Sequence, residues 1–338
     1  MPSNSESWGI YRGTGHAGTG TEDWPEPPGW RSFGGGPDLP APPSDDPYAP
    51  VVLGNVPQPL EPVREEVARV NAALHLRRPL LVMGEPGTGK SSLAYRISRE
   101  LGLGRVLRWQ ITSLSTLREG LYAGDARLGP LGTAFLPHRR PRVLLIDQLD
   151  RAEIALPEDL CTVLTAGGFP LTGSLPPSPP TVLTGPATGP TGLPPGDADG
   201  TVHMATFDDP AVTVPLPGGT VRCHAFPVVV ITTTGDRDLP FDLLRRCVTL
   251  RTTRPSPGLL RAIAAGRFPA DGPGRTPAPD VVDAFLEQAA RTEGPVVERF
   301  LDALQLAADG VLEAVAAQGR SWQEAVGTLW RWTAPEES

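Results

Sequence analysis

Short apolar runs recur through the first three quarters of the chain. They lie at 80–83, 106–112, 143–146, 228–232 and 247–251. Runs of this kind, rich in Val, Leu and Ile and bounded by polar residues, are typical of strands buried on both faces of a parallel sheet. Apolar residues spaced three or four apart predict helices between them, at 63–76, 90–101 and 156–164. Strands that alternate with helices predict an α/β fold.

A second pattern begins at residue 255. Helical spacing of apolar residues recurs at 259–265, 281–290, 296–315 and 321–332. We therefore predict an all-helical second domain over 255–338, which follows an α/β domain over 51–254.

Proline and glycine change this picture at two places. The 41 prolines and 38 glycines are well above average usage, and they concentrate in 1–50 and 170–200. We predict a mostly disordered tail over 1–50, because such composition buries too little apolar surface to offset the entropy of ordering. Trp8, Trp24 and Trp30 allow a second interpretation, in which the tail docks on a neighbouring subunit or partner. The 170–200 segment is predicted to be an irregular surface insertion.

Residues of strand type resume at 202–226, after that insertion. Gly218 and Gly219 separate two β-prone runs, so a hairpin is predicted there. The residues that could suggest a metal site are His138, His203, His224, Asp208 and Asp209. No two of them lie at ligand spacing with a third supporting partner, so we assign them structural or surface roles.

The stretch GEPGTGKS at 84–91 lies between the first apolar run and the helix at 90–101. It fits the phosphate-binding pattern G-x-x-x-x-G-K-[ST] at every fixed position. Glycines let consecutive N–H groups turn toward one anion, and the start of the following helix favours negative charge. Lys90 would reach the β- and γ-phosphates, and the Ser91 hydroxyl would bind Mg²⁺. The predicted phosphate-binding residues are Gly84, Glu85, Pro86, Gly87, Thr88, Gly89, Lys90, Ser91 and Ser92.

Asp147 directly follows the apolar run at 143–146. A carboxylate at the carboxyl end of a buried strand lies where the Mg²⁺ of a bound nucleotide would be held. Its distance from the loop, about sixty residues, is ordinary for an ATPase with this loop, and the two motifs together are more specific than either alone. The sequence therefore predicts Ser91 and Asp147 as the metal ligands.

Charge and cysteine content exclude several function classes. The formal net charge of −8 argues against a nucleic-acid surface and against an anionic-membrane surface. Cys161, Cys223 and Cys247 are odd in number and far apart, which predicts neither a disulfide framework nor a zinc site. The N-terminus lacks a basic start followed by an apolar run, and no segment approaches the roughly 18 apolar residues of a membrane span. We expect a soluble, cytoplasmic protein that binds neither nucleic acid nor membrane.

Four stretches together resemble the AAA+ ATPases and, within them, the MoxR-like group of the dynein-related AAA type. They are GEPGTGKS at 84–91, VLLIDQLDRAEIALPEDLCTVL at 143–164, VVVITTTGDRDLPFDLLRRC at 228–247 and GPVVERFLDALQ at 294–305. The resemblance covers roughly 51–332. More loosely, the chain is similar to MoxR-like ATPases encoded beside von Willebrand factor A domain proteins in bacterial conflict systems.

The resemblance implies a P-loop NTPase αβα sandwich followed by a helical AAA+ lid. It also implies a homo-oligomeric ring, usually a hexamer, that uses ATP and Mg²⁺ to remodel a client or a von Willebrand factor A domain partner. Arg245 or Arg246 would be the arginine finger that reaches the nucleotide of the next subunit; alternatively, both arginines solvate a helix end. Arg299, near the start of the 296 helix, would be the lid sensor.

Two departures from the family pattern bear on catalysis. Gln148 stands where the family has the glutamate that polarises the attacking water, and Thr234 stands at the sensor position of the usual Asn. Glutamine can orient a water but has no basic carboxylate, and losing such a group costs about 10² to 10⁴ in rate. The expected result is tight nucleotide binding with slow turnover. Asp150 or Glu153 could replace the base, although Asp150 is more simply a loop or interface residue.

Three interpretations therefore stay open. The chain is an ATPase that remodels a partner, an ATP-loaded switch or scaffold with little hydrolysis, or a small-molecule kinase. The span 124–140 is short where related proteins carry an element facing the central pore, which favours scaffolding over threading of a polypeptide. The long helical segment after 255 and the Arg245–Arg246 pair argue against the kinase.

Overall fold

The computed structural model describes nine ranges of the chain. They are 8–18, 24–36, 39–54, 60–123, 126–171, 200–269, 275–292, 296–319 and 321–333. Most of the predicted insertion, from 172 to 199, lies outside the described residues. No helix within these ranges is both long enough and apolar enough to cross a membrane.

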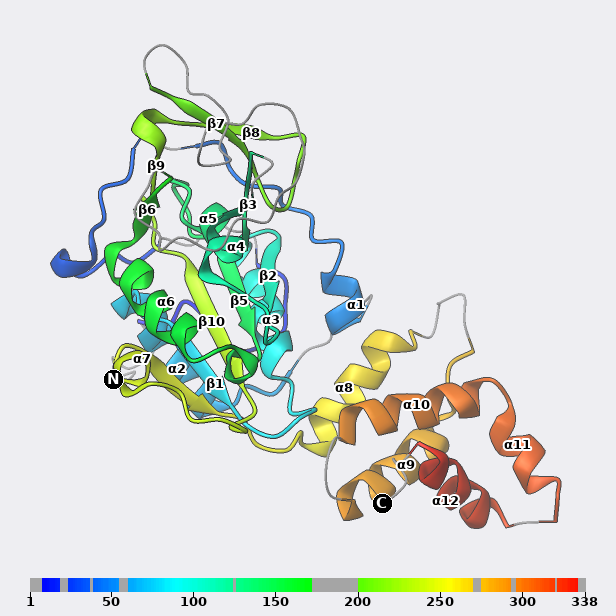
Figure 1. The fold of residues 1–338 in the computed structure, drawn as a ribbon. Coiled ribbons are helices and arrows are strands. Elements are labelled where there is room, and N and C mark those ends of the chain that lie inside the picture. Colours follow the sequence, from blue (N-terminus) through cyan, green and yellow to red (C-terminus); the bar gives the residue numbers. More distant parts are fainter. Residues whose placement is uncertain are drawn as a thin grey trace, which may run out of the picture.

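Five parallel strands form the central sheet of the first domain (Figure 1). In spatial order they are β11 (Val248–Arg251), β1 (Leu80–Met83), β10 (Val228–Thr233), β5 (Val143–Asp147) and β2 (Val106–Gln110). The predicted α/β fold with a parallel sheet is confirmed. Because all five strands run the same way, the residues that follow β1, β5 and β10 meet at one edge of the sheet.

Alternate residues of each strand enter two separate apolar cores. On β1, Leu80 and Val82 pack with α2 (Arg64–Leu76) and α3 (Lys90–Leu101), whereas Leu81 packs on the opposite face. That second core contains residues of α5 (Pro130–Ala134) and α6 (Ala155–Ala166). The sheet is thus covered by helices on both faces, which explains why its strands are continuously apolar.

The predicted hairpin at Gly218 and Gly219 is wrong. β8 (Thr213–Leu216) pairs antiparallel with β7 (Val202–Ala205), whereas β9 (Thr220–Arg222) pairs antiparallel with β6 (Gly168–Pro170). The short turn η3 (Pro217–Gly219) carries the chain from one small sheet to the other. Both glycines have positive φ, 59° and 60°, so they permit this change of direction instead of folding two strands together.

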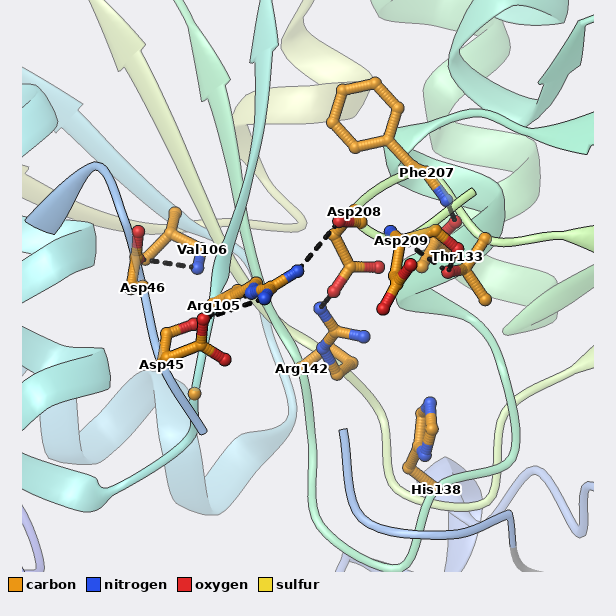
Figure 2. Close-up of polar contacts among 12 residues, drawn as sticks. Asp45, Asp46, Arg105, Val106, Thr133, His138, Arg142, Phe207, Asp208 and Asp209 are labelled. Carbon is orange, nitrogen blue, oxygen red and sulfur yellow. Dashed lines mark hydrogen bonds and ion pairs between the residues drawn. The ribbon is translucent and has the colours of Figure 1, made fainter. Parts of the chain in front are cut away.

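The strands β7 and β8 extend a small sheet at the end of the domain away from the C-terminal helices (Figure 1). Its other members are β4 (Arg127–Leu128) and β3 (Tyr122–Ala123), which precedes α5 and follows α4 (Leu117–Leu121). A buried ion pair fixes this sheet to the core: Arg142 Nη2 lies 2.7 Å from Asp208 Oδ2 (Figure 2). Arg105 donates to the Asp208 carbonyl and also pairs with Asp45.

The predicted disorder of 1–50 does not apply to its described parts. Tyr11 is only 1% exposed and packs in the core that α2 and α3 share. Trp24 packs on the same core, and Phe33 stacks on Phe226 at a ring-centroid distance of 5.2 Å. Short elements η1 (Gly29–Arg31) and α1 (Ala49–Leu53) interrupt an otherwise extended path. Composition misjudged the segment because its few apolar residues reach a core that other elements provide.

In the part of the chain that the structure describes, five helices follow β11 and pack around a core of their own. They are α8 (Pro257–Arg267), α9 (Pro279–Arg291), α10 (Val296–Ala308), α11 (Val311–Ala316) and α12 (Trp322–Trp332). The single helix predicted over 296–315 is broken at Gly310, whose φ of +83° is left-handed. In Figure 1 these helices lie beside the α3 end of the sheet domain.

Candidate nucleotide site

The phosphate loop has the backbone that its sequence predicts. It runs from the end of β1 at Met83 to the start of α3 at Lys90. Gly89 has a φ of +82° and precedes the helix without a side-chain cap in the described chain. A Cβ at Gly84 would lie 2.3 Å from Thr252 Oγ1, in the connection that leaves β11. Glycine is therefore needed at both ends of the loop, and the first N–H groups of α3 point to an anion site.

Lys90 lies inside the loop. The residue is 7% exposed, and Nζ donates to the carbonyl oxygens of Gly84 and Glu85, each at 2.7 Å. Burial lowers the pKa of Lys90, although Asp150 and Asp147 act in the opposite direction. A cation held this close to the loop carbonyls can be redirected to phosphate oxygens with little movement of its backbone.

Ser91 and Asp147 lie together, as their predicted role requires. Ser91 Oγ donates to Asp147 Oδ1 at 2.6 Å, which joins the start of α3 to the end of β5. Thr232 Oγ1 donates to the same carboxylate oxygen at 2.8 Å. The pair offers hydroxyl and carboxylate oxygens, which are the ligands that Mg²⁺ prefers, so these residues fit the metal.

The sequence did not reveal that Arg108 of β2 contacts this carboxylate. Arg108 Nη2 lies 2.7 Å from Asp147 Oδ2, and Nε lies 3.2 Å from it. The carboxylate side chain is 3% exposed, but the arginine side chain is 49% exposed. Arg108 therefore neutralises the carboxylate that is predicted to bind Mg²⁺, and it would have to move if a divalent cation bound there.

Gln148, at the position of the expected base, is held in an unusual backbone conformation. Its φ of +64° is left-handed, and its N–H donates to Thr232 Oγ1 at 2.8 Å. Its side-chain oxygen accepts from Gln110 Nε2 at 3.3 Å. The register of the sheet explains this contact, because Gln110 lies opposite Asp147 on the neighbouring strand. Gln148 is thus oriented by a second amide and carries no basic group.

Thr234 and Asp150 contact each other. Asp150 Oδ2 accepts from the Thr234 hydroxyl at 2.6 Å, from the Thr234 N–H at 2.9 Å and from the Gly235 N–H at 3.1 Å. Burial acts to raise the pKa of Asp150, but these hydrogen bonds outweigh it and lower the pKa below its usual value. Asp150 therefore fixes the loop after β10, and Glu153 lies exposed beyond it.

A cavity of about 220 Å³ opens between the phosphate loop and the C-terminal helices. Its floor includes Gly87, Thr88, Gly89 and Ser92. Its walls come from the segment before α2, from α3, from α8 and from α10, and they are mainly apolar. These wall residues are Val52, Leu53, Leu60, Arg96, Arg99, Leu259, Ala262, Ile263, Arg267, Val297, Glu298, Leu301, Pro255 and Gly15. A second opening beside the loop is lined by Glu85, Pro86 and Arg254, among others.

Arg299 does not line either opening beside the phosphate loop. Its guanidinium carbon lies 4.8 Å from the centroid of the Trp330 ring, and Nη2 donates to the Trp330 carbonyl at 3.1 Å. The neighbouring residues Val297 and Glu298 of α10 face the cavity instead. The sensor role of Arg299 stays a prediction.

Arg245 and Arg246 follow α7 (Phe241–Leu244) and also lie outside the lining of both openings. Arg245 is exposed, and its Nε lies 2.7 Å from Asp242 Oδ1. The carbonyls of both arginines accept from the guanidinium of Arg78. The Arg245 side chain therefore lies on the surface, which is compatible both with an arginine finger and with a residue that solvates a helix end.

The residues considered for a metal site have other contacts. Asp208 pairs with Arg142, and His138 Nδ1 lies 2.8 Å from the Pro40 carbonyl. His138 and Arg142 come from the segment before β5, on the side of the sheet domain shown in Figure 2. Within the described ranges, no group of three or more His, Cys, Asp or Glu residues is arranged to hold a metal ion.

Sequence reasoning missed Arg108, Gln110, Thr232 and Thr252 at this site. Strand periodicity contained a usable signal for two of them, because Arg108 and Gln110 are polar positions in a strand that neighbours the Asp147 strand. Thr232 gave no such signal, since a buried threonine is ordinary in a β-branched strand.

Comparisons with known proteins gave one family match and several similar solved structures. Residues 80–156 match the family described as ATPase family associated with various cellular activities (AAA). Comparison with curated proteins gave no match. Among solved structures, the chain is similar to a point mutant of RuvB from Thermotoga maritima, with 15% identity and a TM-score of 0.40, over 80% of this chain and 68% of that chain.

The chain is also similar to NtrX from Brucella abortus. In complex with ATP, NtrX has 14% identity and a TM-score of 0.33, over 80% of this chain and 49% of that chain. In complex with ADP, the values are 13% and 0.30, over 76% and 45%. The chain thus spans about half of the length of NtrX. The family match runs from β1 to the start of α6 and includes the phosphate loop and Asp147.

Proposed function

We propose that the protein is a Mg²⁺-dependent, ATP-binding AAA+ ATPase of the MoxR-like type that remodels or assembles a partner protein. The observation that carries the proposal is the 2.6 Å contact between Ser91 and Asp147, at the end of a loop that holds Lys90. Hydroxyl, carboxylate and ammonium groups, which phosphoryl transfer requires, therefore all lie at the carboxyl edge of a parallel sheet.

In this proposal each residue of the site has a distinct role. The N–H groups of 84–92 bind the phosphates, Lys90 places its charge on the β- and γ-phosphates, and Ser91 and Asp147 hold Mg²⁺. The metal, when bound, supplies charge neutralisation for the phosphates. Gln148 orients the attacking water by hydrogen bonding and leaves it without a carboxylate base.

Slow hydrolysis follows from two contacts. Gln148 receives a hydrogen bond from Gln110, and the Thr234 hydroxyl is engaged by Asp150. These same contacts favour the second candidate function, an ATP-loaded switch or scaffold that hydrolyses little. In both cases the partner would be a client protein or a von Willebrand factor A domain protein, as in the MoxR-like systems that the sequence resembles.

Assembly into a homo-oligomeric ring, as a hexamer, belongs to the same proposal. The exposed side chain of Arg245, beside the half-buried Arg246, supports a finger role because a residue that reaches a neighbour's nucleotide must lie on the surface. Molar mass by light scattering, with and without ATP and Mg²⁺, tests it. The finger assignment would be excluded if neither Arg245→Ala nor Arg246→Ala reduced the nucleotide-dependent increase in molar mass or the rate of hydrolysis.

Nucleotide binding can be tested on a single side chain, because Lys90 is the only lysine of the sequence. An amine-reactive reagent can therefore modify only Lys90 and the N-terminal amine. We expect Mg²⁺–ATP to protect Lys90 and leave the terminal amine reactive, as read by peptide mass spectrometry. Two results together would refute the proposal. Labelling of Lys90 would be equal with and without nucleotide, and calorimetry would show no heat of ATP binding that is lost in Lys90→Ala.

Phosphate release separates the two candidate functions. We expect Gln148→Glu to raise the rate of turnover by at least about a hundredfold, because it restores the missing base. Asp150→Asn, which removes the other candidate base and disturbs the loop after β10, should not raise turnover. If the parent already turns over at about one per second and Gln148→Glu adds nothing, the explanation of slow turnover is wrong.

A further inference from the structure

Three acidic or amide side chains of α2 and α3 are buried, although none of them belongs to the phosphate loop. Glu66, Asn71 and Glu100 are 8%, 0% and 9% exposed. Buried polar groups are normally paired, because leaving one unpaired costs free energy. All three pair with a single segment, residues 8–18, which we call the N-terminal arm.

Asn71 binds the arm through both ends of its amide. Its Oδ1 accepts from the N–H groups of Ile10 and Tyr11, at 2.9 and 3.0 Å, and its Nδ2 donates to the Tyr11 carbonyl at 2.7 Å. The Tyr11 hydroxyl then donates to Glu66 Oε1 at 2.7 Å. One arm residue is thus fixed at its backbone and at the tip of its side chain.

Glu100 binds the next turn of the arm. Its carboxylate accepts from three consecutive N–H groups, those of Arg12, Gly13 and Thr14, the last at 3.0 Å. Hydrogen bonds from backbone N–H to a carboxylate are about twice as strong as neutral ones. Farther on, Gly18 donates to the Arg99 carbonyl at 3.1 Å, so the arm follows α3 toward its end.

The arm reaches the cavity of about 220 Å³ directly after these anchors. Gly15 lines the cavity together with the phosphate loop and the C-terminal helices. The Thr14 carbonyl accepts from the N–H of Leu60, another wall residue, at 2.8 Å. Glu66 also holds Arg96 in a two-pronged pair at 2.8 Å, and Arg96 is a wall residue as well. The anchors of the arm and the wall of the cavity are therefore one connected structure.

We propose that the N-terminal arm is part of the nucleotide site and determines binding of the base. The inference rests on the proposed function, because it takes the phosphates of ATP to lie on the loop and the base to enter the adjoining cavity. Gly15 of the arm lines that cavity together with Arg96 and Arg99 of α3, and the arm does not contact Lys90, Ser91 or Asp147 in any hydrogen bond of the described chain. It should therefore affect recognition of the nucleoside and leave recognition of the triphosphate unchanged.

The first experiment compares ATP with inorganic tripolyphosphate, each with Mg²⁺, by calorimetry on the full chain. Glu100→Gln replaces an acceptor of three N–H groups by an amide that can no longer satisfy all of them. We expect ATP binding to weaken about tenfold, comparable to the loss of one charged hydrogen bond, while tripolyphosphate binding changes less than about twofold. Glu65→Gln is the matched control, because Glu65 lies on α2, is exposed and pairs only with Arg69 in the described chain.

The second experiment needs no variant. Binding is reciprocal, so if the docked arm favours the base, the base must favour the docked arm. Hydrogen exchange of the peptide that contains residues 12–14 should slow at least about threefold with Mg²⁺–ATP and remain unchanged with Mg²⁺–tripolyphosphate. This measurement remains decisive if Glu100→Gln does not fold.

The outcomes separate this inference from the proposed function. A parent chain that binds neither ligand refutes both. The role of the arm alone is refuted if the parent chain binds ATP but ATP leaves hydrogen exchange of the arm unchanged and Glu100→Gln binds ATP with equal affinity. Equal weakening of ATP and tripolyphosphate in Glu100→Gln would also refute it, because the effect would then not depend on the base.

Discussion

Removing the carboxylate of Asp208 should strongly destabilise the sheet domain. The side chains of Arg142 and Asp208 are 2% and 8% exposed, and they lie 2.7 Å apart. Burial lowers the pKa of Arg142 despite the neighbouring carboxylate, which indicates how poorly this environment solvates a cation. In Asp208→Ala the guanidinium stays in that environment without a counter-charge.

The expected loss follows from comparable buried pairs. Breaking such a pair by removing one partner costs about 3–5 kcal/mol. Because a domain of this size loses about 2–4 °C of melting temperature per kcal/mol, Asp208→Ala should melt roughly 6–20 °C lower. Total stability is typically about 5–15 kcal/mol, so the loss is a large share of it.

Chemical and thermal unfolding, followed by circular dichroism, measure the effect. Asp283→Ala is the matched control, because Arg261 and Asp283 also lie 2.7 Å apart but are more than half exposed. It should cost no more than about 1 kcal/mol. A double variant, Arg142→Leu with Asp208→Leu, should lose less than the two single changes together. If Asp208→Ala costs no more than Asp283→Ala, the reasoning from burial is wrong.

Three further predictions concern metal binding, pH and thiol reactivity. Arg108→Ala should lower the Mg²⁺ concentration needed for half-maximal binding of a fluorescent ATP analogue by about fivefold, since a partly exposed pair contributes about 1 kcal/mol. Arg69→Ala is the control. An unchanged Mg²⁺ requirement in Arg108→Ala would mean that Arg108 does not compete with the metal. Burial lowers the pKa of His138 from 6.5, so the unfolded chain holds the proton more tightly, and the free energy of unfolding should fall as the pH drops below 6.5. Chemical unfolding at pH 5.5 and 7.5 measures this slope, which His138→Gln should reduce; an equal slope in the variant would contradict the assignment. Burial raises the pKa values of Cys223 and Cys247 to about 12 and that of Cys161 less, so a thiol-reactive dye should not label the native protein, whereas rapid labelling would show that these thiols become accessible.

The phosphate loop and its flanking elements could be predicted closely from sequence. The helix expected at 90–101 is α3, with the same limits, because the loop fixes its start and Gly102 ends it in a left-handed conformation. The strands of the central sheet also lie where continuous apolar runs predict them. In these segments local pattern and tertiary position agree, so a prediction from the pattern succeeds.

Contacts between distant segments could not be predicted in this way. Glu66, Asn71 and Glu100 lie on helices whose polar residues would ordinarily face solvent, but the docked arm covers all three and accepts or donates their hydrogen bonds. β6 and β9 pair although the 172–199 segment separates them in the sequence. A turn signal at Gly218 carries no information on that long-range pairing. The contact of Arg108 with Asp147 needs the order of strands in the sheet, and that order is set by packing of the whole domain.

The position of β1 in the sheet has a consequence for how the protein folds. Leu80 lies opposite Val230 on one side and Val248 on the other, so both neighbours of this strand come from late in the sequence. Ribosomes add about 5–20 residues per second, which leaves β1 without one or both of its neighbours for roughly 7 to 34 seconds of synthesis. Non-local parallel pairing is slow in addition. The nascent chain should therefore depend on chaperones through this interval, and ATP can stabilise the domain only after translation has passed β11.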